Sequence, residues 1–324
     1  MSKAIQKILV TGAAGQIGSE LTLALREKYG QDNVVATDCK TALSSKLRDS
    51  GPFYTVDVNQ PHTVQDVVQK HDIDTIVHMA AILSAVGEKK PEQAWNVNIN
   101  GMINILNIAR DRGMVQVLVP SSIAVFGPGT PLDNTPNDTV LRPTTMYGIT
   151  KVAGELLCDY YVAKYGLDVR GLRYPGIVSA ETLPGGGTTD YAVAIFYEAI
   201  KNGRYTCFVR EDTRLPMMYM PDCIKATLDL MSAPFYSLKH HSNFNVGSMS
   251  FTVGELAAEI QKHLPGFECF YEPDFRQQIA ESWPSSVDDS AARREWGWAP
   301  EFDLASMTKD MLGKLGEKHK AGLL

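Results

Sequence analysis

Tyr147 and Lys151 stand four residues apart in a segment whose apolar pattern predicts a helix. Residues at this spacing lie one above the other on the same helix face, so a phenol and an ammonium can meet over one ligand. A phenol with a pKa of about 10 keeps its proton at neutral pH, but a nearby cation favours the phenolate. The pair could therefore act as a base in proton transfer. The same spacing also suits a surface packing pair, so the rest of the chain must decide.

The amino-terminal segment has the pattern of a dinucleotide site. Residues 7–11 form a short apolar run that predicts a strand, residues 12–18 carry Gly12, Gly15 and Gly18, and regularly spaced leucines then lead into a helix. The glycines allow a tight turn and a close backbone approach to a pyrophosphate. The unpaired N–H groups at the start of the following helix would bind the same anion.

A carboxylate indicates which cofactor this site accepts. Residues 33–37 predict a second strand that ends at Asp38, 20 residues after Gly18. A carboxylate at that place can accept hydrogen bonds from both ribose hydroxyls, and it would repel an added 2′-phosphate. The sequence therefore predicts NAD rather than NADP, although Asp38 could also be an ordinary turn or helix-capping residue.

Composition excludes several classes of protein. The chain has 324 residues, of which 44% are hydrophobic, and this is enough for a large core. Its net charge of -6 without a basic run argues against nucleic acid as a partner, and it has no apolar stretch of membrane-spanning length. Five cysteines without a Cys-x-x-Cys spacing suit free thiols, and the His240-His241 pair lacks further metal ligands nearby, so we expect no metal site.

Strand and helix patterns alternate along the first half of the chain. Strands are predicted at residues 53–56, 74–78, 116–120 and 168–173, and helices at residues 62–70, 93–112 and 146–165. This alternation predicts an α/β fold of the Rossmann type, with a doubly wound parallel sheet. Ser121 and Ser122 follow the strand at 116–120, at the sheet edge where ligands bind, although they could instead be turn or capping serines.

The character of the chain changes after about residue 175. Residues 183–190 and 213–218 are rich in Pro and Gly and are predicted to be long loops. We therefore expect an NAD-binding Rossmann domain at residues 1–175 and a smaller carboxyl-terminal, substrate-binding portion at residues 176–324. Some late strands and helices would return to the first domain. The three glycines at 185–187 could be the hinge of a closing lid or only a mobile surface turn.

These motifs together resemble the extended short-chain dehydrogenase/reductase superfamily, which includes the UDP-galactose epimerases. The carboxyl half is more specific: residues 173–177, 184–193, 215–219 and 281–284 closely resemble the short-chain L-threonine 3-dehydrogenases. The resemblance runs over nearly the whole chain. It implies that NAD oxidises the β-hydroxyl of L-threonine to L-2-amino-3-oxobutanoate, without a metal.

The resemblance also implies a role for each matching residue. Tyr147 would be the general base, Lys151 would lower its pKa and hold the nicotinamide ribose, and Ser122 would bind the reacting oxygen. The implied cofactor contacts are Gly12, Gly15, Gln16, Ile17, Asp38, Asp57, Val58, Ala80, Tyr147, Lys151 and Ile177. The implied substrate contacts are Ser84, Ser122, Tyr147, Gly186, Thr188 and Thr189.

Two other functions stay open at this point. A nucleotide-sugar epimerase or dehydratase would share the fold, but this chain has Pro175 and Leu215-Pro216 where those families carry polar partners for a diphosphate. A non-catalytic NAD-binding protein would not need Tyr147, Lys151 and Ser122 together. The resemblance also implies a homodimer that pairs the helices at 93–112 and 146–165. We expect a cytoplasmic protein, or one of the mitochondrial matrix if a presequence has been removed.

Overall fold

A parallel sheet organises the first half of the chain in the computed structural model, which describes residues 4–41, 43–183 and 185–324. Its strand order is β3-β2-β1-β4-β5-β7, and every neighbouring pair is parallel. The strands are β1 (Ile8–Thr11), β2 (Val34–Asp38), β3 (Phe53–Thr55), β4 (Thr75–His78), β5 (Gln116–Leu118) and β7 (Val169–Arg170). The prediction of a Rossmann-type, doubly wound parallel sheet is confirmed.

Helices cover both faces of this sheet, because successive residues of a buried strand point to opposite sides. Ile8 and Val10 pack in the core with α1 (Gln16–Tyr29) and α9 (Met220–Ser232). Leu9, between them, packs in a second core with three further helices. Those helices are α3 (Pro61–Lys70), α6 (Met102–Arg112) and α7 (Met146–Tyr165).

Helix α7 has the predicted bounds, whereas the predicted helix at 93–112 is built differently. It starts earlier, as α5 (Pro91–Trp95), passes through a π-helical turn (Asn96–Gly101) and continues as α6. Proline at the first helical position accounts for the early start, since a missing N–H costs nothing there. The short helices α2 (Ser45–Asp49) and α4 (Ser84–Lys89) complete this half.

The predicted strand at 168–173 is divided between two sheets. β7 belongs to the main sheet, while β8 (Leu172–Tyr174) pairs in parallel with β6 (Ser121–Ser122) and with β12 (Phe244–Asn245). Gly171 lies at the division, and a Cβ there would be 2.4 Å from the Val119 carbonyl oxygen. The segments that follow β5 and β7, together with β12 from late in the chain, therefore form a small parallel sheet next to the main sheet.

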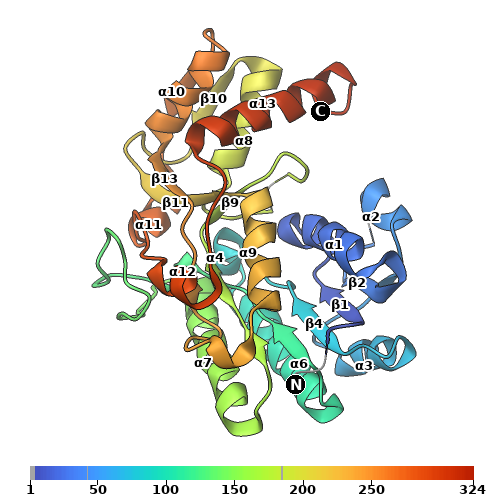
Figure 1. Ribbon diagram of the computed structural model, residues 1–324. Coiled ribbons are helices and arrows are strands. Elements are labelled where there is room, and N and C mark those ends of the chain that lie inside the picture. Colours follow the sequence, from blue (N-terminus) through green and yellow to red (C-terminus); the bar gives the residue numbers. More distant parts are fainter. Residues whose placement is uncertain (1–3, 42, 184) are drawn as a thin grey trace.

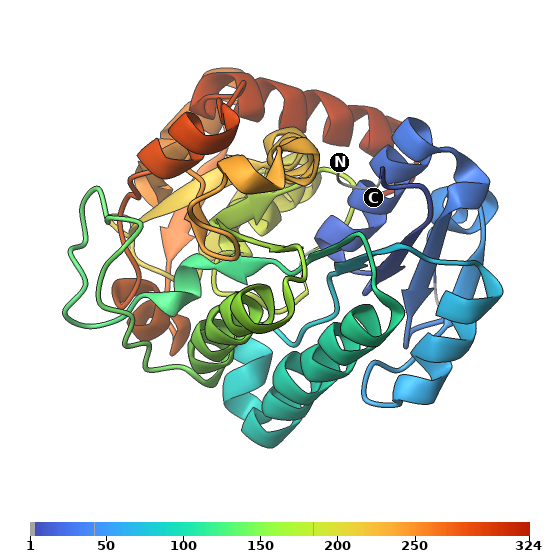
Figure 2. The ribbon, with the colours of Figure 1, turned by 60° about the horizontal axis from the view of Figure 1, so that its bottom comes forward.

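The smaller carboxyl-terminal part has its own strands and helices. β9 (Gly176–Val178), β11 (Arg214–Tyr219) and β13 (Met249–Thr252) form one sheet, and β10 (Arg204–Cys207) pairs with β14 (Glu268–Tyr271). Its helices are α8 (Tyr191–Asn202), α10 (Val253–His263), α11 (Arg276–Glu281), α12 (Ser290–Trp296) and α13 (Leu304–Lys320). In Figure 1, α8, α10 and α13 gather at the top, far from α6 and α7 at the bottom, and Figure 2 shows the same separation from a turned view.

The prediction of a loop at 213–218 was wrong, because these residues form most of β11. Pro216 pairs with Ser250 of β13, but the ladder with β9 begins only at Met217. A proline is therefore placed where the strand has a partner on one side only. In contrast, residues 185–190 lie outside any helix or strand, as predicted.

The division at residue 175 stays a prediction. Side chains from α9, β12 and Trp298 share one apolar core with β1 and α1, so late residues do pack against the main sheet. Within the described ranges, no helix is long and apolar enough to cross a membrane.

Candidate active site

The glycine-rich turn between β1 and α1 has the geometry that a pyrophosphate site needs. Gly12 has φ +69°, and a Cβ there would lie 2.5 Å from the backbone nitrogen of Ala80. Gly18 passes so close to Gly12 that a Cβ would be 2.2 Å from the Gly12 carbonyl oxygen. Gly15 caps α1 without any side-chain hydrogen bond. The helix amino terminus therefore presents its N–H groups to a ligand.

The neighbouring polar groups also fit a dinucleotide. The side-chain nitrogen of Gln16 is buried without a hydrogen-bond partner among the described residues. Asp38 ends β2 and accepts hydrogen bonds from the backbone nitrogens of Ala14 and Lys40, both at 2.9 Å. Each carboxylate oxygen keeps a lone pair for a further donor. The structure thus brings the carboxylate beside the glycine turn, as the sequence predicted.

The other predicted cofactor residues lie around the same sheet edge. Asp57 and Val58 follow β3, and Asp57 accepts a hydrogen bond from the backbone nitrogen of Asn59 at 2.9 Å. Ala80 follows β4 and lies against Gly12. Ile177, on β9, lines the cavity described next, and Ile17 lines it from the opposite side at the start of α1.

A cavity of about 140 Å³ opens at the carboxyl ends of the strands. Tyr147 and Lys151 reach it from α7, and Ser122 reaches it from β6. Thr145 caps α7 by accepting a hydrogen bond from the backbone nitrogen of Gly148, so the helix starts just before Tyr147. The predicted catalytic residues are therefore brought together by two elements that contact each other.

The electrostatics of this group differ from the sequence-based expectation. Burial raises the pKa of Tyr147 to about 12, and hydrogen bonding with Ser122 only partly opposes that rise. The Lys151 ammonium lies 5.6 Å from the centre of the Tyr147 ring and donates a hydrogen bond to the Pro120 carbonyl oxygen at 2.7 Å. Burial also lowers the pKa of Lys151 to about 8. In this structure, desolvation therefore outweighs any help that Lys151 gives to the phenolate.

The predicted substrate residues occupy a second wall. Ser84 starts α4, and its hydroxyl lies 3.0 Å from that of Thr188 and accepts a hydrogen bond from the Thr188 backbone nitrogen. Ser84 and Thr189 line the cavity, whereas Thr188 is buried behind it. Gly186 has φ +100° and does not line the cavity. Pro184, in the same run, lies outside the described residues.

Asp190 and Trp283 also line this cavity, and the sequence analysis gave neither of them a role. Asp190 is the only carboxylate among the described lining residues, and Trp283 is the only tryptophan among them. The Asp190 oxygen Oδ2 accepts hydrogen bonds from the backbone nitrogens of Gly186 and Gly187, at 2.8 and 2.7 Å. Both residues belong to runs that had supported the resemblance, at 184–193 and 281–284. The amino-acid substrate that the resemblance implies has an ammonium group, which needs an anionic partner. A search for a carboxylate in the matching runs could have identified Asp190.

No cluster of three or more His, Cys, Asp or Glu side chains suited to a metal ion occurs in the part of the chain that the structure describes. His78, which lines the cavity from β4, is instead paired with the Thr11 hydroxyl at 2.8 Å. Burial lowers its pKa to about 3, so its ring is neutral.

A glycine turn, a Tyr-Lys pair and a strand-end serine thus lie at one edge of a doubly wound sheet. Residues 8–247 match the model of the NAD dependent epimerase/dehydratase family, and the chain belongs to that family. It is therefore an enzyme of a family that uses NAD, and the glycine turn, Gln16 and Asp38 fit this cofactor.

Individual relatives are similar over their full length. A Staphylococcus haemolyticus protein described as an uncharacterized epimerase/dehydratase is 48% identical over 98% of this chain and 99% of its own. The solved L-threonine dehydrogenase of Clostridium difficile is 50% identical, with a TM-score of 0.95 over 98% of this chain and 99% of its own. A monomeric L-threonine 3-dehydrogenase from a metagenome is also 50% identical, with a TM-score of 0.92 over 96% and 99% of the two chains.

Proposed function

We propose that this enzyme oxidises the β-hydroxyl of L-threonine with NAD, giving L-2-amino-3-oxobutanoate, NADH and a proton. One observation carries the proposal: a single cavity holds the proton-transfer group of Tyr147, Ser122 and Lys151 together with one carboxylate, Asp190. A substrate that fits this cavity needs a hydroxyl that contacts Tyr147 and Ser122 and an ammonium that contacts Asp190. The similarity to solved L-threonine dehydrogenases supports the same substrate.

Tyr147 is the proposed general base. Its phenolate oxygen takes the proton of the substrate hydroxyl, while Ser122 holds the reacting oxygen by a hydrogen bond. Bound NAD supplies the hydride acceptor, and its positively charged ring favours the phenolate. Lys151 adds a second positive charge and a donor for the cofactor ribose. Because burial, only partly opposed by the hydrogen bond with Ser122, raises the pKa of Tyr147 to about 12, the base needs these charges near neutral pH.

Asp190 is the proposed partner of the substrate ammonium. Its Oδ2 is occupied by the Gly186 and Gly187 backbone donors, so Oδ1 is the oxygen available to a ligand. Ser84 and Thr189 line the same wall and would bind the substrate carboxylate. Thr188 would act with Ser84, to which it is hydrogen-bonded, and Gly186 would serve as the hinge of a closing lid.

The cofactor would lie along the sheet edge. Gly12, Gly15, Gln16 and Ile17 would contact the pyrophosphate, and Asp38 the adenosine ribose. The remaining cofactor contacts, at the adenine and nicotinamide ends, would be made by Asp57, Val58, Ala80 and Ile177.

The test is NADH formation, measured with the purified protein and a panel of L-threonine, L-serine, L-allo-threonine and UDP-sugars. L-Threonine should be oxidised well and L-allo-threonine poorly, because inverting Cβ turns the transferred hydride away from its acceptor. Conversion of UDP-sugars without amino-acid oxidation would establish the epimerase alternative. NAD binding without turnover of any substrate would favour a non-catalytic protein.

We also propose a homodimer. On α7, Ile149, Leu156 and Tyr160 are 41%, 65% and 46% exposed, at spacings that place them along one side of the helix, and Trp95 on α5 is 42% exposed. A second copy would bury these apolar side chains. Since one similar solved enzyme is described as monomeric, light scattering on the protein as it elutes from a column should decide between monomer and dimer.

We also propose a cytoplasmic location. The bacterial source of the curated relative favours the cytoplasm over the mitochondrial matrix.

A further inference from the structure

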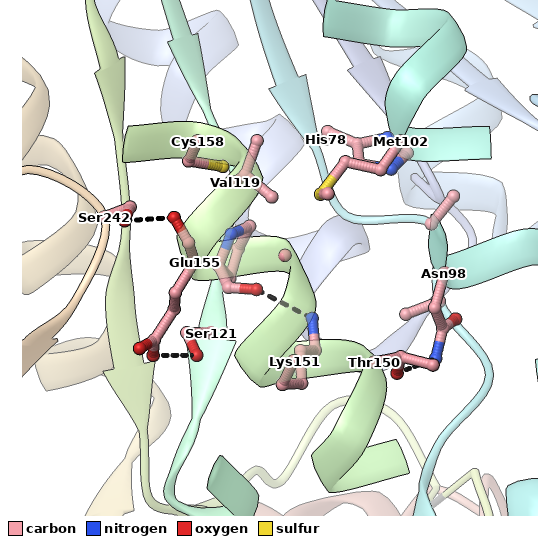
Figure 3. Close-up of a pocket in the computed structure, with 14 residues that line it drawn as sticks. His78, Asn98, Met102, Val119, Ser121, Thr150, Lys151, Glu155, Cys158 and Ser242 are labelled. Carbon is pink, nitrogen blue, oxygen red and sulfur yellow. Dashed lines mark hydrogen bonds between the residues drawn. The ribbon is translucent and has the colours of Figure 1, made fainter. Parts of the chain in front are cut away.

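A buried ion pair lies one helical turn beyond Lys151. Glu155, four residues further along α7, is 5% exposed, and Arg173 of β8 is 1% exposed. The guanidinium binds both carboxylate oxygens, with Nε to Oε1 and Nη2 to Oε2 each at 2.8 Å. The Ser121 hydroxyl also donates to Glu155 Oε1 at 2.5 Å. In Figure 3, Lys151 and Glu155 lie on successive turns of α7, and both reach the strand that carries Ser121.

Arg173 ties this pair to two more segments. Its Nη1 donates to the Asn137 carbonyl oxygen at 2.7 Å and to Asn245 Oδ1 at 3.1 Å. Asn245 belongs to β12, and Asn137 lies between β6 and α7. Ion pairs that are buried this deeply need such added hydrogen bonds to offset the loss of water. Three further segments, at residues 121, 137 and 245, thus fix the position of the pair.

The same short segment contacts both the ion pair and the catalytic group. Pro120 accepts the hydrogen bond of Lys151, Ser121 donates to Glu155, and Ser122 is the proposed partner of Tyr147. The three contacts come from consecutive residues, 120–122, and they meet three residues on one face of α7. A displacement of Glu155 would therefore move residues 120–122, and with them the groups that contact Lys151 and Tyr147.

The charges around Lys151 are also balanced by this pair. Tyr147, Glu155 and Cys158 face Lys151 from α7, and His78 faces it from β4. Burial keeps the Cys158 thiol and the His78 ring neutral. Burial lowers the pKa of Lys151, while Cys158 and then Glu155 raise it by a smaller amount. Arg173, which is paired with Glu155, carries a positive charge that offsets the charge of the carboxylate.

We propose that Glu155 and Arg173 are positioning residues for the reaction: they hold α7 in register with residues 120–122 and balance the charge that Lys151 experiences. The proposal rests on the proposed function only in taking Tyr147 and Lys151 as the catalytic pair. It predicts opposite effects for the two members of the pair, which loss of a merely structural contact would not produce.

The following variants distinguish the effect of the pair on the position of α7 from its effect on the charge near Lys151. Glu155→Gln removes the negative charge and should lower the pKa of Lys151 by about one unit, whereas Arg173→Gln should raise it. The double variant should return it toward the wild-type value. Ser121→Ala keeps all charges and should lower kcat about tenfold without moving the pH dependence. Asp168→Asn breaks another buried two-point pair, with Arg170 of β7, and should lower only thermal stability.

The measurements are the alkaline limb of the kcat profile, KM for both substrates, the melting temperature, and the titration of Lys151 followed by NMR in lysine-labelled protein. The NMR titration does not need turnover, so it tests the ion pair even if L-threonine proves not to be the substrate. Shifts of the same sign in Glu155→Gln and Arg173→Gln, or none, would overturn the charge balance. If these variants do not fold, Ser121→Ala decides, since wild-type kcat in that variant would refute the positioning role.

Discussion

Replacing Asp190 by Asn tests the substrate assignment most directly. The amide oxygen can still accept the hydrogen bonds that Gly186 and Gly187 give to Oδ2, so the loop keeps its shape while the charge disappears. A hydrogen bond to a charged group contributes about 1.5–3 kcal/mol. Since each 1.36 kcal/mol is a factor of ten, kcat/KM for L-threonine should fall about 10- to 150-fold. Most of the loss should be in KM, because the ammonium is bound equally before and during hydride transfer.

A substrate without the ammonium provides the control. Steady-state rates of NADH formation should be compared for L-threonine and 3-hydroxybutanoate, in the wild type and in Asp190→Asn. The wild type should strongly prefer L-threonine, and the variant should lose most of that preference by losing activity on L-threonine alone. An equal loss on both substrates would show that Asp190 acts on the structure of the site rather than on the ammonium.

Four further predictions follow from the site and its surroundings. Tyr147→Phe should lower kcat at least about 100-fold with little change in NAD affinity by fluorescence titration, and near-normal turnover would disprove its role as base. Asp38→Ala should reduce the preference for NAD over NADP in kcat/KM, because the repulsion of a 2′-phosphate is lost; equal use of both by the wild type would contradict this. Gly186→Pro should depress turnover with a small change in melting temperature, since it removes a φ of +100° and a donor to Asp190 in a loop. Burial lowers the pKa of His240, but hydrogen bonds with Glu295 and Asp138 outweigh this effect, so the pKa is raised overall. The stability that this pairing contributes is present below about pH 6.5 and is lost as the pH rises through the raised pKa of His240. His240→Gln should therefore lower the melting temperature at pH 6 and have little effect well above that pKa.

Local patterns predicted the positions of the main elements well. The glycine turn, the second strand ending at Asp38 and the full extent of α7 were all visible, because each depends on residues that are close in the sequence. β11 was taken for a loop, since its partners β9 and β13 are distant in the sequence and Pro216 suggested an irregular segment. The π-helical turn before α6 had no local signal.

The sequence predicted which residues gather at the candidate site, but it did not predict their pKa values. The i, i+4 spacing of Tyr147 and Lys151, taken together with the glycine turn and the strand-end serines, predicted that both residues belong to one site, and both line one cavity. That burial would raise one pKa and lower the other depends on the packing of β6, β8 and α4 around them, which no spacing reveals. Asp190 was missed for a related reason: only the folded structure shows that its carboxylate lines the same cavity as Tyr147 and Lys151 of α7.

The shared core of the main sheet has a consequence for how the chain folds during synthesis. The face of β1 that carries Ile8 and Val10 is covered by α9, β12 and Trp298, which the ribosome makes long after the strand itself. Until then only α1 and its neighbours would cover this face, and a fragment that stops near residue 175 would keep the rest of its apolar surface exposed. Such a fragment should aggregate or recruit chaperones, although it contains every strand of the main sheet. The predicted contacts for the pyrophosphate and the adenosine are thus all made by residue 58, but the apolar core beneath them is complete only when the last quarter of the protein has been made.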